Sequence, residues 1–373
     1  MAARAEGLSA AIEFLLRLQD ECGGVIPVER YMQEALYHPE HGYYSRNIRT
    51  VGRRGDFATS ASLGEALGTA IARWLATNRI PARGPWHVIE AGAGTGELAR
   101  TVLRRLGMWR RRGLTYHIVE TSPVLRAEQQ RALTPWRFSP AMWRVAWHDS
   151  MAAALAACGG RVLIFSNELI DAFPCRVLER RDGHWIEVGV RIENGRIVER
   201  AFPREAPEGL PDGLPEGQRI EVHAAAAEWI ATWSGAASEA RMLTIDYGDT
   251  LPALYHRRPR GTLRAYFHHQ RFEGTEVYNR FGKQDLTADV NFTALRDWTE
   301  RCGWHTTALV TQAEFFATHG ATHAGLHDAQ LADHTGAGAA FKVLIQEKSP
   351  REGEAPAEPL VGKSGLGGSL ALP

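Results

Sequence analysis

Short apolar runs recur along the chain, and the spaces between several of them fit a helix. Residues 98–106, for example, place apolar side chains at helical spacing between two such runs. Strands that alternate with helices are typical of a mostly parallel sheet covered on both faces, so we predict an α/β fold. In such a sheet, ligands bind beyond the carboxyl ends of the strands, where the loops converge. The runs lie at 87–89, 117–119, 145–147, 162–165, 242–245 and 341–345.

Three other kinds of segment flank these runs. Between residues 175 and 202, short strand-like runs are joined at Asp182-Gly183 and Asn194-Gly195. Because Asn-Gly between alternating residues favours a two-residue hairpin turn, we expect a β insertion there. The leader, residues 22–60, holds several Pro and Gly residues among aromatics and is expected to be irregular. Apolar spacing predicts helices at 9–20, 63–74 and 224–233.

The most informative stretch is a glycine-rich loop after the first run. Glu90 ends the run, and Gly92, Gly94 and Gly96 follow at alternate positions before a helix-like segment. Glycines there permit a sharp turn and the close approach of a ligand to the backbone. The spacing is GxGxG, not the GxGxxG of dinucleotide sites, and a carboxylate at position 90 suits a cationic ligand, such as the ammonium of S-adenosylmethionine. Nicotinamide nucleotide binding and a purely structural turn are the alternative interpretations.

Polar residues also follow the next strands. Glu120 ends the second run, where an acid can accept hydrogen bonds from both ribose hydroxyls, and the pair Glu90 and Glu120 indicates a class I methyltransferase. An acid at a helix start is the alternative for Glu120. Asp149 follows the third strand as an adenine contact or a plain turn residue. Asn167 follows the fourth strand, as a cofactor contact or a helix cap.

Composition narrows the class of protein. The 43 Lys and Arg residues balance the 43 Asp and Glu residues, which disfavours a general nucleic-acid binder. Four scattered cysteines without a CxxC pair predict neither a zinc site nor a disulfide framework. No apolar run approaches the ~20 residues of a membrane span, and the acidic N-terminal residues do not resemble an export signal, so we expect a cytoplasmic protein. The Pro- and Gly-rich residues 348–373 are expected to form a disordered tail.

Several ordered motifs carry a resemblance to a known family. Over residues 8–347 the chain resembles the MidA-type family of S-adenosylmethionine-dependent methyltransferases, which includes the mitochondrial arginine methyltransferase that helps assemble respiratory complex I. The resemblance implies a class I (Rossmann-like) methyltransferase core with a mostly parallel sheet, an N-terminal helical and loop extension, and a β insertion. The matching motifs lie at 37–44, 55–57, 117–126, 167–174, 245–248, 261–266 and 311–312, with Phe315 after the last. The expected division is an extension covering the site (1–75), the core (76–174 and 236–347), the insertion with its helix (175–235) and the tail (348–373).

The same resemblance implies arginine in a partner protein as the methyl acceptor. Because the guanidinium stays charged, carboxylates must orient it and accept the proton released after transfer. We expect Glu168 to bind the guanidinium and Asp171 or Asp56 to accept the proton. A methyltransferase for a small molecule and a non-catalytic, cofactor-binding assembly factor are the alternative interpretations, because acids common in relatives after Ser60 are replaced here. The substrate-binding residues implied by the resemblance are Gly55, Phe57 and Thr59.

Two further expectations concern metals and assembly. His319, His323 and His327 share one helical face, but Gly320 and Gly325 weaken a helix there, and we expect no metal site. Apolar surface on the hairpins of the β insertion can support a homodimer, and we expect no membrane partner.

Overall fold

The structure is a computed structural model of the 373-residue chain. It describes residues 2–47, 65–81, 83–134, 138–139, 143–202, 204–207, 209–320 and 325–349. Four predicted site residues, Gly55, Asp56, Phe57 and Thr59, lie outside the described residues, as does the tail from residue 350 onward.

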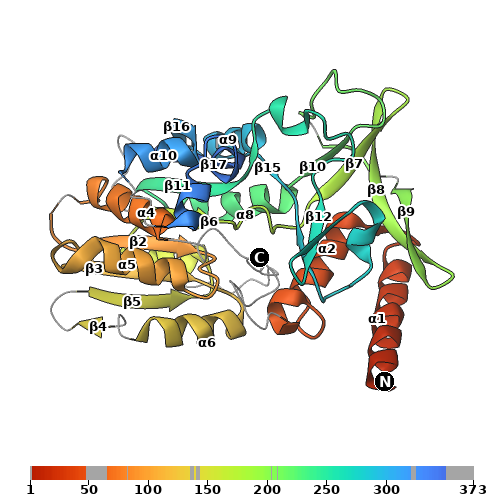
Figure 1. Ribbon diagram of the computed structural model, residues 1–373, viewed down its shortest axis with the longest axis horizontal. Helices are drawn as coiled ribbons and strands as arrows, with labels where there is room; N and C mark the ends of the chain where they lie inside the picture. Colours follow the sequence, from red (N-terminus) through yellow and green to blue (C-terminus); the bar gives the residue numbers. More distant parts are fainter. Residues whose placement is uncertain are drawn as a thin grey trace.

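A nine-stranded sheet forms the centre of the described chain (Figure 1). Its order is β16-β17-β11-β6-β2-β3-β5-β4, with β15 beside β11. Strands β2, β3, β5, β6 and β11 are parallel, whereas β17 runs antiparallel to both of its neighbours. All six apolar runs lie in strands of this sheet, which confirms the predicted α/β class. The bounds are β2 (Trp86–Ala91), β3 (Leu114–Val119), β4 (Phe138–Ser139), β5 (Trp143–His148), β6 (Arg161–Asn167), β11 (Glu239–Asp249), β15 (Val290–Asn291), β16 (His305–Thr311) and β17 (Phe341–Lys348).

Helices cover both faces of this sheet (Figure 1). Val88 of β2 packs in a core with α4 (Ala66–Thr77), α5 (Glu97–Arg110) and α10 (Gln312–Thr318). Its neighbour Ile89 packs on the opposite face, because successive strand residues point to opposite sides. That face is covered by α7 (Met151–Cys158), α8 (Ala224–Ser234) and α9 (Phe292–Arg301). Burial on both faces explains why these strands are continuous apolar runs. The remaining helices of this part are α6 (Pro123–Ala132), α11 (Leu326–Leu331) and α12 (Ala337–Ala340).

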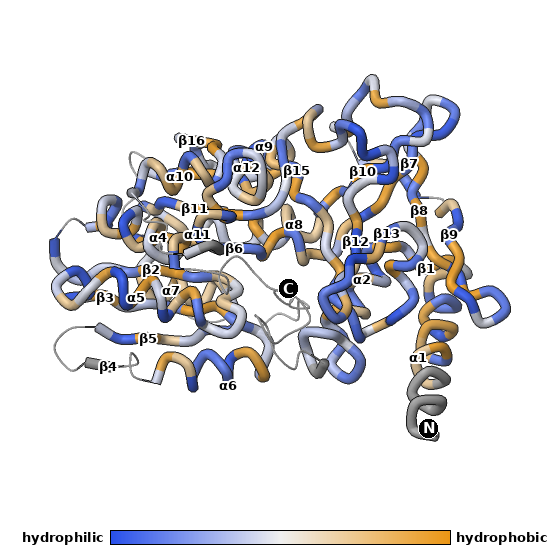
Figure 2. The backbone as a smooth tube through the Cα atoms, viewed as in Figure 1, coloured by the Kyte–Doolittle hydropathy of each residue, from blue (hydrophilic) through white to orange (hydrophobic). Residues whose placement is uncertain are grey.

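A second lobe with its own apolar core lies beside the central sheet (Figure 1). The N-terminal helices α1 (Ala2–Glu21) and α2 (Val28–Tyr37) pack there against two small sheets. Apolar stretches of β8 run beside α1 in Figure 2, and the two elements are in contact. The strands are β1 (Ile26–Pro27), β7 (Arg176–Arg181), β8 (His184–Glu193), β9 (Arg196–Phe202) and β10 (Arg219–Val222) in one sheet, and β12 (Arg264–Phe267), β13 (Gln270–Glu273) and β14 (Asp285–Thr287) in the other. Short helical turns lie at η1 (Tyr43–Asn47), η3 (Ala253–Tyr255) and η4 (Gly274–Tyr278).

The predicted hairpins are present in the β insertion. Asp182 and Gly183 have φ values of 51° and 76°, and Asn194 and Gly195 have values of 50° and 72°. Two successive positive φ values are the signature of the primed turn that Asn-Gly and Asp-Gly sequences favour. The turns place β7, β8 and β9 in antiparallel pairs.

Parts of the extension and of the core differ from expectation. The leader was expected to be irregular, yet α2 forms directly after Pro27 and buries Tyr31, Met32 and Ala35 against the second core. Its apolar spacing fits a helix, and nearby Pro and Gly residues obscure that signal. Helix α4 continues to Thr77 and packs on α5, so the expected boundary at residue 75 falls inside a core helix. Residues 264–287, expected in the core, form the small sheet β12–β14. No helix in the described part of the chain has the length and hydrophobicity needed to span a bilayer.

Candidate functional site

The predicted glycine-rich loop connects β2 to α5. Gly92, Gly94 and Gly96 have φ values of 69°, 51° and 82°, a left-handed region that residues with a Cβ rarely adopt. A Cβ on Gly92 would lie 2.7 Å from Leu169 Cδ1, whereas no described atom lies within 4 Å of a Cβ built on Gly94. The loop therefore opens at Gly94, where a ligand can approach the backbone.

Glu90 lies buried beneath this loop, with 2% of its surface exposed. The Tyr116 hydroxyl donates a hydrogen bond to Glu90 Oε2 at 2.5 Å. Burial raises the pKa of the Glu90 carboxyl to about 7, because desolvation disfavours the charged form. A cation bound nearby would favour ionised Glu90, and its contact with the ammonium end of S-adenosylmethionine stays a prediction.

Glu120 directly follows β3, and its buried carboxylate is held in place by hydrogen bonds. Its Oε1 accepts a hydrogen bond from the Ser122 N–H at 2.9 Å, and its Oε2 accepts one from Gln129 Nε2 at 2.8 Å. Ser122 caps α6, which begins at Pro123, so Glu120 precedes the helix and the helix-start interpretation is wrong. Burial raises the pKa of Glu120 to about 7, against the opposing effect of these hydrogen bonds.

Gln129 is a site residue that the sequence interpretation missed. It is fully buried on α6 and also donates to the Gly94 carbonyl at 2.9 Å. The sequence gives little signal for Gln129, because a Gln in a helix is normally exposed to solvent. Only the packing of α6 on the glycine-rich loop reveals its contacts.

Asp149 lies at the rim of this region. It follows β5, and its side chain is mostly exposed and ion-paired with Arg126. The preceding residue, His148, accepts a hydrogen bond from the Glu120 N–H through its carbonyl at 3.1 Å. The structure thus places Asp149 beside Glu120 at neighbouring strand ends, where the adenine contact stays a prediction.

Asn167 ends β6, on the other side of the loop, and Glu168 directly follows it. Residues 168–175 form bends and turns, so the helix-cap interpretation of Asn167 is wrong. Its Nδ2 donates to Glu168 Oε1 at 3.1 Å. Glu168 has a φ of 50°, and its N–H donates to the Ile245 carbonyl at 3.0 Å. A left-handed backbone at a residue other than Gly costs roughly 1–3 kcal/mol and is found preferentially at functional sites.

Asp171 and Asp246 form a buried acidic pair next to Glu168. Asp171 Oδ2 accepts a hydrogen bond from the Thr287 hydroxyl at 2.8 Å, while its buried Oδ1 has no hydrogen-bond partner among the described residues. Asp246 is fully buried and accepts the N–H groups of Ile170 and Asp171 at 2.9 and 3.3 Å. Burial raises the pKa of Asp171 to about 6, and it raises that of Asp246 well above its usual range. In the sequence, Asp246 appeared only within a family motif.

The leader spans both halves of this region. The Tyr44 hydroxyl donates to Asp285 Oδ1 at 2.7 Å, and the Tyr37 hydroxyl donates to the Ala172 carbonyl at 2.7 Å. The two rings stack with centroids 5.6 Å apart. On the cofactor side, the Ser122 hydroxyl donates to the Tyr44 carbonyl at 3.0 Å. Burial raises the pKa of Asp285 to about 7, and nearby Asp171 adds to the shift.

One buried arginine accompanies these acids. Arg264 pairs with Asp289, and its guanidinium lies 5.5 and 5.8 Å from the ring centroids of Tyr247 and Tyr266. Its charge lowers the pKa of Asp171, in opposition to burial. The region therefore holds a guanidinium already, between an acid and two aromatic rings.

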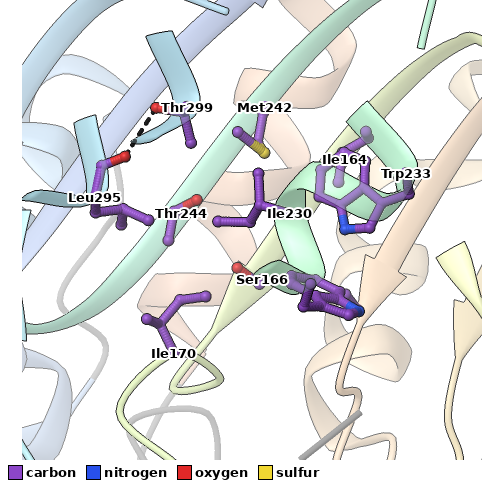
Figure 3. Close-up of a pocket in the computed structure, with 11 residues that line it drawn as sticks. Ile164, Ser166, Ile170, Ile230, Trp233, Met242, Thr244, Leu295 and Thr299 are labelled. Atoms are coloured by element: carbon purple, nitrogen blue, oxygen red, sulfur yellow. Dashed lines mark hydrogen bonds between the residues drawn. The ribbon is translucent and has the colours of Figure 1, made fainter. Parts of the chain in front are cut away.

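Two cavities elsewhere are not the cofactor site. The cavity in Figure 3 lies under β6 and β11, and its lining includes Ser166, Thr244 and Met242. At about 10 Å³ it has room for about one water molecule. A cavity of about 350 Å³ beside Tyr255 and Trp298 contains none of the predicted site residues in its lining. Neither cavity is lined by Gly94 or Glu120, at the strand ends where the cofactor is predicted to bind. Across the described chain, no cluster of three or more His, Cys, Asp or Glu side chains could hold a metal ion.

Comparisons with known proteins bear on this site. A family model for S-adenosyl-L-methionine-dependent methyltransferases matches residues 66–310. The mitochondrial protein arginine methyltransferase NDUFAF7 of Danio rerio is 31% identical over 308 residues, which cover 73% of this chain and 68% of that protein. The Drosophila melanogaster homologue is 30% identical over 203 residues, which cover 50% of this chain and 46% of that protein. The match thus spans less than half the length of the fly protein.

A solved structure agrees with these sequence matches. A Burkholderia thailandensis protein bound to S-adenosyl-homocysteine superposes with a TM-score of 0.75 at 28% identity, covering 93% of both chains. The resemblance, the Rossmann-like fold and the cofactor predicted from the sequence are confirmed, and S-adenosylmethionine supplies the methyl group. The chain belongs to the family of S-adenosylmethionine-dependent methyltransferases of the MidA type.

Proposed function

We propose that this methyltransferase modifies a guanidinium nitrogen of arginine in a partner protein. The observation that carries the proposal is the buried Asp171 Oδ1, an acceptor without a hydrogen-bond partner among the described residues, in a cluster with Asp246 and Asp285. A guanidinium brings a permanent positive charge and five N–H donors, which match such a cluster. The names of the relatives, protein arginine methyltransferases, support the same acceptor.

The cofactor would lie between the two strand ends already described. Glu120 presents two oriented carboxylate oxygens to the ribose hydroxyls, and Glu90 faces the ammonium end beneath the open loop at Gly94. S-adenosylmethionine, when bound, supplies an electrophilic methyl group on a sulfonium. The protein's own task is to hold the acceptor nitrogen in line with that methyl group.

The acidic residues have different tasks in this proposal. Glu168, held in a left-handed conformation at the end of β6, binds the guanidinium and turns its plane toward the methyl group. Asp171 accepts the proton that the nitrogen releases, a role that its raised pKa of about 6 favours, since a more basic carboxylate is the better proton acceptor. Asp56 stays a predicted third member and lies outside the described residues.

Labelled methyl transfer tests the proposal. The wild type, supplied with radiolabelled cofactor and a lysate, is expected to label protein, and hydrolysis should release methylarginine. Glu168→Gln and Asp171→Asn are each expected to lower the rate roughly 100-fold, because each removes an electrostatic contact to the reacting group. Glu300→Gln on the exposed end of α9 is the control and should keep the wild-type rate.

Other labelling patterns would contradict this assignment. Label in a small molecule, or in another amino acid, would replace arginine as the acceptor. Full turnover of Glu168→Gln on a verified arginine substrate would remove its assigned role.

Compartment and assembly stay predictions. Composition favours the cytoplasm, whereas the curated relatives carry "mitochondrial" in their names. Cell fractionation of the tagged chain decides between the two compartments. A homodimer through the β insertion is tested by light scattering on the purified protein, with a mass of 41.3 kDa expected for a monomer.

A further inference from the structure

Gln129 lies where three strand ends of the cofactor region meet. Its amide nitrogen donates to the Gly94 carbonyl at 2.9 Å and to Glu120 Oε2 at 2.8 Å. Its amide oxygen accepts a hydrogen bond from the Trp147 indole at 3.2 Å. Both N–H donors and the carbonyl are therefore engaged, with groups from the loop after β2, from the end of β3 and from β5.

The packing around Gln129 shows that this contact is built into the fold. The residue is fully buried, on the second turn of α6, whose start is fixed by the Ser122 cap. A Cβ on Gly96 would lie 3.2 Å from Gln129 Cα, so the glycine permits α6 to approach the loop closely. The side chain has little room for another conformation.

The contact constrains Glu120 in a specific way. Oε1 is held by the Ser122 N–H and Oε2 by Gln129, so both oxygens are fixed in position. A carboxylate has about four lone-pair sites in total, so the fixed Glu120 carboxylate can still accept a ribose hydroxyl. The same amide nitrogen fixes the Gly94 carbonyl, so the ribose-binding acid and the loop cannot move apart.

We propose that Gln129 is a positioning residue for S-adenosylmethionine, which acts by tying the carboxylate of Glu120 to the glycine-rich loop at Gly94. The inference rests on the family assignment and not on arginine as the acceptor. In this proposal, the Gln129 amide holds Glu120 and the loop at Gly94 in fixed relative positions before the cofactor binds. Preorganisation of this kind appears as cofactor affinity.

Isothermal titration of the whole chain with S-adenosylhomocysteine tests the inference. Gln129→Met keeps an unbranched side chain of similar length but donates no hydrogen bond. We expect its Kd to rise roughly 10- to 100-fold, the range for losing a hydrogen bond to a charged group. Gln130→Met, one position along the same helix, is the matched control and is expected to stay within about twofold of the wild type.

A double-mutant cycle separates positioning from simple packing. If Gln129 acts through Glu120, Glu120→Gln will weaken binding much less in the Gln129→Met background than in the wild type. If the two effects instead multiply, Gln129 does not act through Glu120 and the inference is overturned. A wild-type Kd for folded Gln129→Met overturns it as well.

A second variant keeps the test decisive if Gln129→Met does not fold. Gln129→Asn retains the amide but is one methylene shorter, so it loses the reach to Glu120. A Kd raised at least tenfold in this variant, with a circular dichroism spectrum like that of the wild type, supports the inference. An unchanged Kd contradicts it. Because titration needs no methyl acceptor, failure here leaves the proposed arginine substrate untouched.

Discussion

At the scale of single residues, burial raises the pKa of several carboxyl groups in and near the predicted cofactor region, which favours their protonated form. Glu90 and Glu120 are buried carboxyls whose pKa values rise to about 7, and Asp285 on the acceptor side behaves alike. Burial disfavours their charge, and a bound cation restores it. Because their pKa values are raised on folding, these groups contribute stability to the free protein at low pH, and this contribution is lost as the pH rises from about 4 through 7. The site is thus poised for a positively charged ligand.

Cofactor affinity should therefore depend on pH. If Glu90 must be ionised to receive the ammonium group, the affinity for S-adenosylhomocysteine is expected to rise about tenfold between pH 6 and pH 8, since one group with a pKa of about 7 is linked to binding. Titration calorimetry at several pH values measures the slope. Glu90→Gln should bind more weakly and lose most of the slope. A variant with the wild-type slope would show that another group titrates.

At the scale of elements, glycines in hairpin turns and at helix ends differ in their backbone conformation. Gly195 closes the hairpin between β8 and β9 with a φ of 72°, whereas Gly235 at the end of α8 has a φ of −62°. No described atom lies within 4 Å of a Cβ built at either position, so space is not the constraint. The backbone conformation alone distinguishes them.

This difference predicts opposite effects of one substitution. Gly195→Ala is expected to lower the free energy of unfolding by about 1–2 kcal/mol, because an alanine in the left-handed region places Cβ near the carbonyl oxygen. Gly235→Ala, the matched control, is expected to be neutral or to stabilise by up to about 1 kcal/mol. Urea denaturation measures both values. Equal effects at the two positions would contradict the assignment to backbone conformation.

At the scale of the whole molecule, the leader makes hydrogen bonds to both the central sheet region and the second lobe. It contacts the cofactor side at Ser122 and the acceptor side at Asp285 and Ala172. Tyr44 takes part in two of these contacts, through its carbonyl and its hydroxyl. The leader therefore lies beside the cluster of Asp171, Asp246 and Asp285, although these residues are far from it in the sequence.

Tyr44→Phe should weaken acceptor binding and leave cofactor binding intact. The variant removes one hydrogen bond between the leader and Asp285, and we expect the acceptor KM to rise roughly 5- to 10-fold, in line with a contact worth about 1 kcal/mol. Steady-state kinetics and calorimetry separate the two ligands. Tyr31→Phe, which removes a buried hydrogen bond to the Tyr278 carbonyl in the second core, is the control and should lower stability only.

Sequence alone determined the central sheet, the hairpin turns and the family of this protein. These features are local: apolar runs, a glycine pattern with a preceding acid, and Asn-Gly turns each depend on a few adjacent residues. The juxtaposition of Glu90 and Glu120 was predicted for the same reason, because strand ends converge in any parallel sheet, and their contacts with the cofactor stay a prediction.

The distant residues that lie beside the predicted site residues became visible only in the folded chain. Gln129, Asp246 and Asp285 carry no local signal of their contacts, and their partners lie in other elements. The leader helix α2 and the sheet β12–β14 form because they bury apolar surface against a second core assembled from four separate stretches of chain. Burial and hydrogen bonding between distant segments depend on packing, which a local pattern does not encode.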